Sequence, residues 1–122
     1  MIWTAVGAAA LALAVMLGAF GAHGLRGKLD GYSMGIYERA VFYHFVHALG
    51  LLIVPILARL NALNQSSATL VCALLAAGIA LFSGTLYLLA VTGTRWLGAI
   101  TPIGGLCFIA AWLVLAIALA RG

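Results

Sequence analysis

The chain has 122 residues, of which 66% are hydrophobic and 7% are charged, and its formal net charge is +4. Soluble domains carry about 25% charged residues, so this composition excludes a soluble domain and indicates an integral membrane protein. The Lys and Arg residues are scattered through an apolar chain and form no soluble basic face, which excludes nucleic-acid binding.

Four apolar runs predict four membrane-spanning helices, at about residues 2–22, 38–59, 68–91 and 97–120. Each run approaches or exceeds the roughly 20 residues that a helix needs to cross a bilayer. The runs should be helical because hydrocarbon cannot satisfy open backbone groups. Short connectors make consecutive helices antiparallel. The sequence therefore predicts an all-α integral membrane protein, a single up-down-up-down four-transmembrane-helix bundle with both termini on the same side.

Small residues recur at every fourth position on two of the predicted helices. The first helix carries them at Ala10, Ala14, Gly18 and Ala22, and the third carries them at Ala76, Ala80 and Gly84. Such stripes let helix backbones approach closely, which matters because lipid provides no hydrophobic drive for helix association. Two interpretations stay open, namely packing within one chain and a homo-oligomer interface.

The second predicted span begins with titratable residues where hydrocarbon would be expected. At about 100° per residue, an arc of about 160° holds Arg39, Tyr43, His47, His44 and Tyr37. Ionisable groups in spans rarely face lipid, so this arc is predicted to face the bundle interior or a subunit contact. Glu38 lies on the other side of the helix and is expected to pair with a basic residue near the same membrane face.

The rest of the chain offers a helix cap and two cysteines. Ser66 or Ser67 is predicted to cap the third helix. Cys72 and Cys107 lie in apolar runs at different predicted depths, and their spacing fits neither a disulfide nor a zinc site. The two histidines of the second span leave one helix in neighbouring directions and cannot clamp a single haem. We expect no cofactor and no metal.

Four motifs along the chain are similar to those of a known family. Residues 18–24 read GAFGAHG, residues 43–49 read YHFVHAL, residues 81–87 read LFSGTLY, and residues 101–105 read TPIGG. In this order and at these spacings they resemble the YgdD/YwdK-like family of small bacterial inner-membrane proteins, domain-of-unknown-function family 423, which has mitochondrial relatives in animals. The resemblance covers nearly the whole chain and implies a four-span protein of the inner membrane with no settled biochemical function. In the family pattern the position of His44 is usually Gln.

All four motifs fall in one half of the predicted bundle. Its polar residues are predicted to form one layer and to be the candidate ligand-binding residues: His23, Arg39, Tyr43, His44, His47, Ser83, Tyr87 and Thr101. We expect His47 and Tyr43 to face the interior. At least one of them should hydrogen-bond to Ser83, Thr85, Tyr87 or the backbone near Thr101, because an unpaired imidazole in hydrocarbon costs several kcal/mol.

Such a layer suits a small amphiphile, a lipid head group or a quinone. Arg39 and Lys28 would meet an anion, and His47 and the tyrosines would donate hydrogen bonds. Two other functions stay open: a structural or assembly role in which the layer is interhelical glue, and an oligomeric channel or transporter. No nucleophile–base set, phosphate loop or paired carboxylates occur, so no catalytic residue is predicted. Membrane lipids are the expected partners.

Overall fold

The computed structural model describes residues 2–122, which form four helical rods. In chain order the elements are α1 (Ile2–Phe20), the π-helical segment η1 (Gly21–Leu25), α2 (Gly31–Arg59), α3 (Gln65–Gly78), the π-helical segment η2 (Ile79–Gly84), α4 (Thr85–Thr92), the 3₁₀ segment η3 (Arg95–Ala99) and α5 (Thr101–Arg121). The third rod is α3, η2 and α4 in succession, and the fourth is η3 followed by α5.

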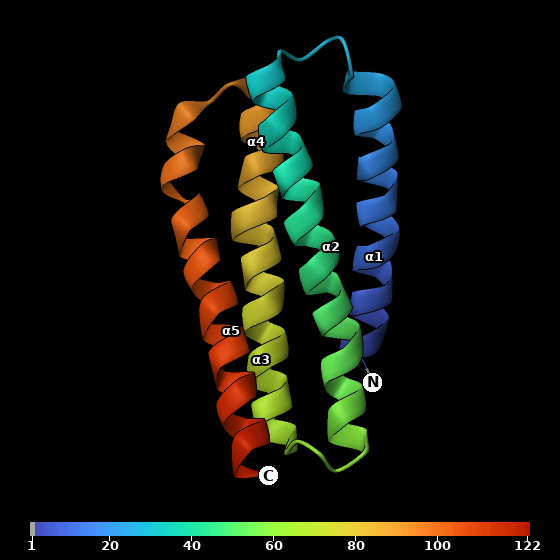
Figure 1. The fold of residues 1–122 in the computed structure, drawn as a ribbon, viewed down its shortest axis with the longest axis vertical. Helices are drawn as coiled ribbons and strands as arrows, with labels where there is room; N and C mark the ends of the chain where they lie inside the picture. Colours follow the sequence, from blue (N-terminus) through green and yellow to red (C-terminus); the bar gives the residue numbers. More distant parts are fainter. Residues whose placement is uncertain (1) are drawn as a thin grey trace.

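The rods alternate in direction, and the two chain ends lie toward the same end of the bundle (Figure 1). We call this the lower end of the bundle; it also holds the connection at 60–64. The upper end holds the connections at 26–30 and 93–94. Within residues 2–122, four stretches are long and apolar enough to cross a membrane: Ile2–Leu25, Gly31–Arg59, Gln65–Thr92 and Arg95–Arg121. The predicted four-helix membrane bundle is confirmed.

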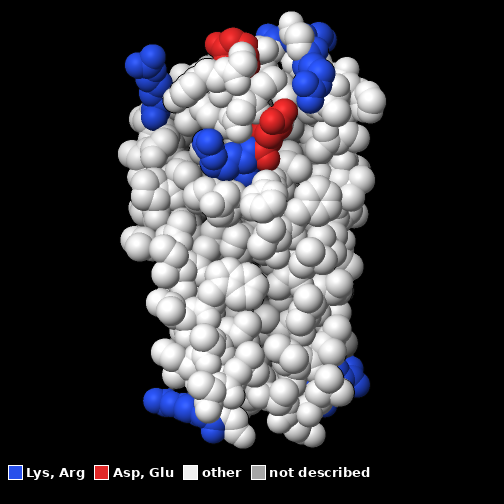
Figure 2. Space-filling model, viewed as in Figure 1, with Lys and Arg blue, Asp and Glu red and all other residues white. Residues whose placement is uncertain are grey.

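Charged side chains gather at the two ends and leave an uncharged band between them on the face shown in Figure 2. The basic residues of the upper end are Arg26, Lys28, Arg39 and Arg95, and those of the lower end are Arg59 and Arg121. This distribution is typical of a protein whose middle lies in hydrocarbon and whose ends lie among head groups.

Helix α2 begins at Gly31, whereas the predicted span begins near residue 38. The carboxylate of Asp30 explains the early start, because its Oδ1 accepts a hydrogen bond from the N–H of Ser33 at 2.7 Å and caps the helix. With a rise of about 1.5 Å per residue, the 29 residues of α2 exceed the roughly 30 Å thickness of a hydrocarbon core. The helix is therefore long enough to carry its first turns into the head-group region.

The cap predicted for the third helix is wrong, because Asn64 occupies the N-cap position rather than Ser66 or Ser67. The backbone of Asn64 is extended, and its side-chain Oδ1 accepts a hydrogen bond from the N–H of Ser67 at 2.8 Å. Asparagine is among the best N-cap residues. The helix therefore begins earlier than the two serines suggested.

Helix α1 packs against α2 through small residues. A Cβ atom on Gly7 would lie 2.6 Å from the backbone nitrogen of Leu52, so the two backbones are in direct contact there. Farther along α1, Ala14 is fully buried and Gly18 faces the side chain of Val41. Ala14 and Gly18 of the predicted stripe therefore pack within the chain, whereas Ala22 is exposed. Homo-oligomer formation stays a prediction.

Helix α5 approaches the π-helical segment η2 just as closely. A Cβ atom on Gly104 would overlap the backbone nitrogen of Phe82, whereas one on the adjacent Gly105 would lie 3.8 Å from the Phe82 ring. Pro102 lies in the first turn of α5, where its missing N–H costs no helical hydrogen bond. The TPIGG sequence thus starts α5 and fits its backbone against the third rod.

We expect reporters fused to the two ends of the chain to lie in the same compartment. Four antiparallel rods that each cross the bilayer return the chain to the side from which it started. Paired fusions to a fluorescent protein that folds only in the cytoplasm and to a phosphatase active only outside it would measure this. Ends in opposite compartments would mean that one rod does not span.

Candidate functional site

A buried polar layer in the upper half of the bundle joins α2 to the third rod. The hydroxyl of Ser83 donates to the carbonyl oxygen of Ala40 at 2.8 Å, and the hydroxyl of Tyr87 is hydrogen-bonded to Nδ1 of His44 at 2.8 Å. Ser83 is 0% exposed and His44 is 2% exposed. Interhelical hydrogen bonds of this kind contribute about 0.6–2 kcal/mol each in membranes.

Further hydroxyl groups extend the layer to the other two rods. The hydroxyls of Thr85 and Thr101 are 2.7 Å apart, which links α4 to α5. The hydroxyl of Tyr37 donates to the carbonyl oxygen of Leu17, which links α2 to α1. All four rods therefore contribute to one layer, although the first rod does so through the backbone of Leu17, outside the motif at 18–24.

His47 is buried but does not make the predicted hydrogen bond. Its Nδ1 donates to the carbonyl oxygen of Tyr43 at 2.7 Å, one turn earlier on the same helix, and its ring stacks on Phe108 with centroids 3.5 Å apart. Tyr43 is half-buried, and its ring packs against Phe82 with centroids 4.5 Å apart. Neither Tyr43 nor His47 bonds to the partners predicted for it, because aromatic rings fill that part of the interior and the nearest acceptor lies in α2 itself. His44 forms the interhelical bond instead.

Two of the predicted ligand-binding residues lie outside the layer. The side chains of His23 and Arg39 are exposed, so Arg39 does not share the interior face of α2 with the histidines; the alternative, that it lies at a subunit contact, stays a prediction. A long basic side chain near a helix end can reach the head groups. The angular position of a residue around the helix axis does not show this, because it takes no account of side-chain length. The prediction for Glu38 is confirmed, because its carboxylate lies 3.6 Å from the guanidinium of Arg26 at the same end.

The polar layer leaves one buried atom unsatisfied within residues 2–122. By distance and angle, Nε2 of His44 is buried without a hydrogen-bond partner there, although the imidazole lies near the backbone of Ala10 in α1. Within the same residues, no three His, Cys, Asp or Glu side chains lie close enough to hold a metal ion. Apart from Nε2 of His44, the polar side chains of the layer are hydrogen-bonded to one another or to backbone carbonyl groups.

The sequence did not reveal that two of the motifs form π-helical segments. Segment η1 covers the end of the first motif, and segment η2 covers the start of the third. Single π-helical turns within α-helices occur often at functional sites. The glycines of these motifs were the only available signal, and glycine in an apolar span is equally compatible with close helix packing.

A pocket of about 590 Å³ opens at the upper end, between the start of α2 and the connection that leads into η3. On the α2 side it is lined by Asp30, Tyr32, Ser33 and Ile36. On the other side it is lined by Leu89, Gly93, Arg95 and Gly98. None of the eight predicted ligand-binding residues lines this pocket. It combines residues of two separate connections, and the motifs did not point to it.

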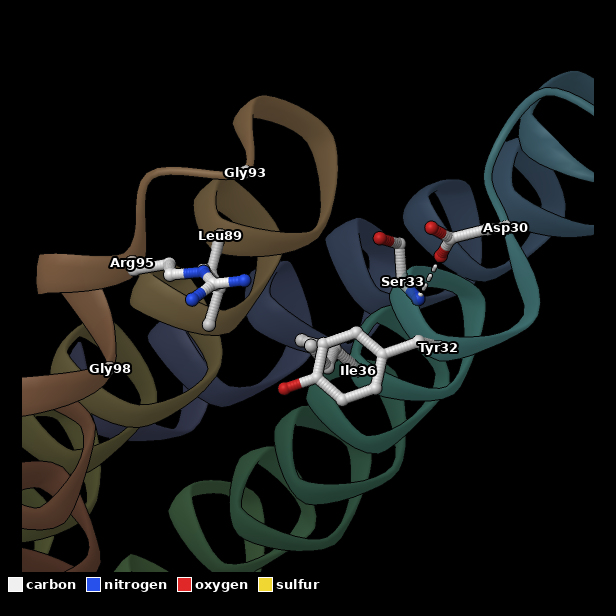
Figure 3. A pocket seen from close by; sticks show the side chains of 8 residues that line it. All are labelled: Asp30, Tyr32, Ser33, Ile36, Leu89, Gly93, Arg95 and Gly98. Carbon is white, nitrogen blue, oxygen red and sulfur yellow. Dashed lines mark hydrogen bonds between the residues drawn. The ribbon is translucent and has the colours of Figure 1, made fainter.

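The walls of the pocket carry opposite charges. Figure 3 shows Asp30 on one side and Arg95 on the other, with the ring of Tyr32 between them in this view. Hydrogen bonds from the backbone and side chain of Ser33 hold the pKa of the Asp30 carboxyl below its usual range. The apolar side chains of Ile36 and Leu89 also line the pocket. The pocket therefore offers a cation, an anion and an apolar surface.

Comparison with known proteins gives a family and close relatives. The model of the family described as "Protein of unknown function (DUF423)" matches residues 17–105. The UPF0382 membrane protein YwdK of Bacillus subtilis is 48% identical over 114 residues, which cover 93% of this chain and 91% of that protein. A UPF0382 membrane protein of Staphylococcus epidermidis is 50% identical over 113 residues, covering 93% of this chain and 90% of its own. One of Staphylococcus haemolyticus is 49% identical over 112 residues, covering 92% and 89%. No solved structure matches the chain.

Proposed function

The chain belongs to the DUF423 family of proteins of unknown function, and on that premise we propose that it binds a membrane amphiphile in the pocket at its upper end. The family resemblance inferred from the four motifs is confirmed, and the chain is a membrane protein like its relatives. The ligand-binding proposal itself rests on the geometry of the pocket.

The observation that carries the proposal is an unpaired guanidinium beside apolar side chains in one pocket. Within residues 2–122 Arg95 forms no ion pair, and a guanidinium suits a phosphate because it presents a planar fork of donors. Ile36 and Leu89 line the same pocket and would contact the first carbons of an acyl chain. The volume of about 590 Å³ falls within the range of about 300–1,000 Å³ that is usual for small-molecule sites.

The polar layer supports a structural role rather than a second ligand site. The hydroxyls of Ser83, Thr85 and Tyr87 are hydrogen-bonded to groups of other rods or of their own helix. Satisfied groups offer little to a ligand, whereas they fix the relative positions of the helices. In this proposal the layer acts as interhelical glue that holds α2 and α4 in the positions that shape the pocket.

The proposal includes the bacterial inner, or cytoplasmic, membrane as the location. The relatives named above are bacterial membrane proteins. Apolar α-helices that satisfy their own backbone hydrogen bonds suit such a bilayer. The uncharged band between two charged ends, visible in Figure 2, is consistent with this location.

A photoreactive lipid tests the pocket directly. The purified protein, reconstituted in bilayers, would be labelled with a phospholipid that carries a diazirine at the head group, and the labelled residues would be mapped by mass spectrometry. We expect labels in residues 30–36 and 93–98. Replacement of Gly98 by phenylalanine should reduce labelling, because a Cβ atom there lies beside Leu89, 3.9 Å away, and a ring would occupy pocket space.

Gly35 provides the matched control for this experiment. A Cβ atom on Gly35 has nothing within 4 Å, and this residue does not line the pocket. Gly35→Phe adds the same ring to the same end of the bundle and should leave the labelling unchanged. Labels spread evenly over the lipid-facing side chains, and unaffected by Gly98→Phe, would rule out the pocket as a binding site.

A further inference from the structure

The two charged side chains of the pocket are not paired with each other or with any other charge within residues 2–122. The ion pair described at this end of the bundle joins Arg26 to Glu38 instead. Asp30 accepts hydrogen bonds only from Ser33 within residues 2–122, one of them from its backbone N–H at 2.7 Å, and no cation lies against it there. Arg95, on the opposite side, has its donors free (Figure 3). A ligand that bears one charge of each sign would satisfy both walls.

Both wall charges persist at neutral pH. A guanidinium is not deprotonated in proteins. The hydrogen bonds from Ser33 lower the pKa of Asp30, so its carboxyl is fully ionised above the acid range. The pocket therefore combines a cation and an anion and differs from a purely basic surface, which would select any anionic lipid.

The aromatic ring of the pocket fits a small ammonium. The ring of Tyr32 is 79% exposed and lies between the charged groups in Figure 3, where its face is available to a cation. The hydroxyl of Ser33 also lines the pocket and is hydrogen-bonded to the Asp30 carboxylate on the same wall.

We propose that the pocket selects a zwitterionic head group of the phosphoethanolamine class, with the phosphate at Arg95 and the primary ammonium at Asp30 and Tyr32. This inference rests on the proposed function, since it names the class of amphiphile bound at the same pocket. A head group with only a phosphate would leave Asp30 unpaired beside an anion. A choline head group has no N–H to donate to the carboxylate of Asp30, so it satisfies the carboxylate less well than ethanolamine does.

Lipid binding to the purified, delipidated full chain tests this selectivity. Native mass spectrometry in detergent would give dissociation constants for phosphatidylethanolamine, phosphatidylglycerol and phosphatidylcholine with identical acyl chains. We expect the ethanolamine lipid to bind about threefold to fivefold more tightly than the other two, the factor that an exposed ion pair supplies. Soluble glycerophosphoethanolamine, added as a competitor, shows whether the head group alone binds. If glycerophosphoethanolamine displaces phosphatidylethanolamine only at a large excess, the ligand is the whole lipid rather than the free head group.

Asp30→Asn is the decisive variant, because asparagine keeps the helix cap and removes the charge. This variant should abolish the preference for phosphatidylethanolamine over phosphatidylglycerol, while α2 stays capped. Arg95→Gln should weaken the binding of all three lipids. Lys28→Gln, at the same end but outside the pocket, should weaken the binding of none selectively.

Equal affinities in the unmodified chain, or a preference that survives Asp30→Asn, would overturn the zwitterion proposal. Loss of binding in Gly98→Phe would still support the pocket, whereas binding unaffected by both Gly98→Phe and Arg95→Gln would overturn the proposed function itself.

Discussion

Replacing Gly104 by alanine is expected to destabilise the bundle severely, by about 3 kcal/mol, the upper end of the usual range for overpacking. The added Cβ atom would overlap the backbone nitrogen of Phe82 in segment η2. Backbone atoms within a helix cannot turn aside as a side chain can, so α5 must move away from the third rod. The thermal midpoint of the purified protein in detergent should fall sharply, and less folded protein should reach the membrane.

Gly105→Ala is the control, since it makes the same substitution one residue farther along α5. A Cβ atom on Gly105 would be in ordinary contact with the Phe82 ring, at 3.8 Å. Alanine is also the better helix former, by up to about 1 kcal/mol in a helix interior, so this variant should be neutral or slightly stabilised. Similar losses of stability in both variants would show that α5 does not contact η2 through its backbone.

Tyr87→Phe is expected to cost about 1–2 kcal/mol of stability, although it removes only one oxygen atom. The hydroxyl of Tyr87 is hydrogen-bonded to Nδ1 of His44, whose side chain is 2% exposed. Within residues 2–122, Nε2 of that histidine has no partner, so the variant would leave a buried imidazole without any of the hydrogen bonds described for it. Reversible unfolding in mixed detergent would measure the loss.

A double-mutant cycle separates the hydrogen bond from the packing. His44→Leu should remove most of the additional cost of Tyr87→Phe, because no buried nitrogen is then left unsatisfied. Tyr43→Phe serves as the control, because the structure gives the Tyr43 hydroxyl no hydrogen bond within residues 2–122; its effect should stay within about 0.5 kcal/mol. A coupling energy near zero between positions 44 and 87 would mean that this pair does not stabilise the bundle.

The architecture followed from the sequence because run length and connector length are strong constraints in a bilayer. Four apolar runs and short polar connectors leave few arrangements other than an antiparallel bundle. The beginning of α2 was less accessible, since residues 31–37 are not uniformly apolar and only the cap at Asp30 shows that the helix extends over them. Hydropathy locates the part of a helix that lies in hydrocarbon, and it says little about turns that continue into the head-group region.

The polar layer was predictable in part as a set of residues, since His23 and Arg39 lie outside it, but not as a set of bonds. Motif positions placed Ser83, Tyr87 and the histidines in one half of the bundle. Helical periodicity could not decide between His44 and His47 as the partner of Tyr87, since both are buried on α2. That choice depends on the local course of the third rod, which changes in η2. The pocket was missed because Asp30 and Arg95 are far apart in sequence and carry no motif.

The π-helical segments constrain which insertions and deletions the chain can tolerate. A turn closed by bonds to the fifth residue holds one residue more than a turn closed by bonds to the fourth. Deleting one residue from η2 would remove this extra residue and leave the faces beyond it nearly unrotated, whereas deleting one residue from the regular helix α3 would rotate everything beyond it by about 100°. Thr85, Leu86 and Ala90, now buried, would then turn away from their neighbours and towards the acyl chains. Length differences between related chains should therefore accumulate in the connections at 26–30 and 60–64, at the chain ends and, one residue at a time, in the π-helical segments, while the regular helices keep their residue count.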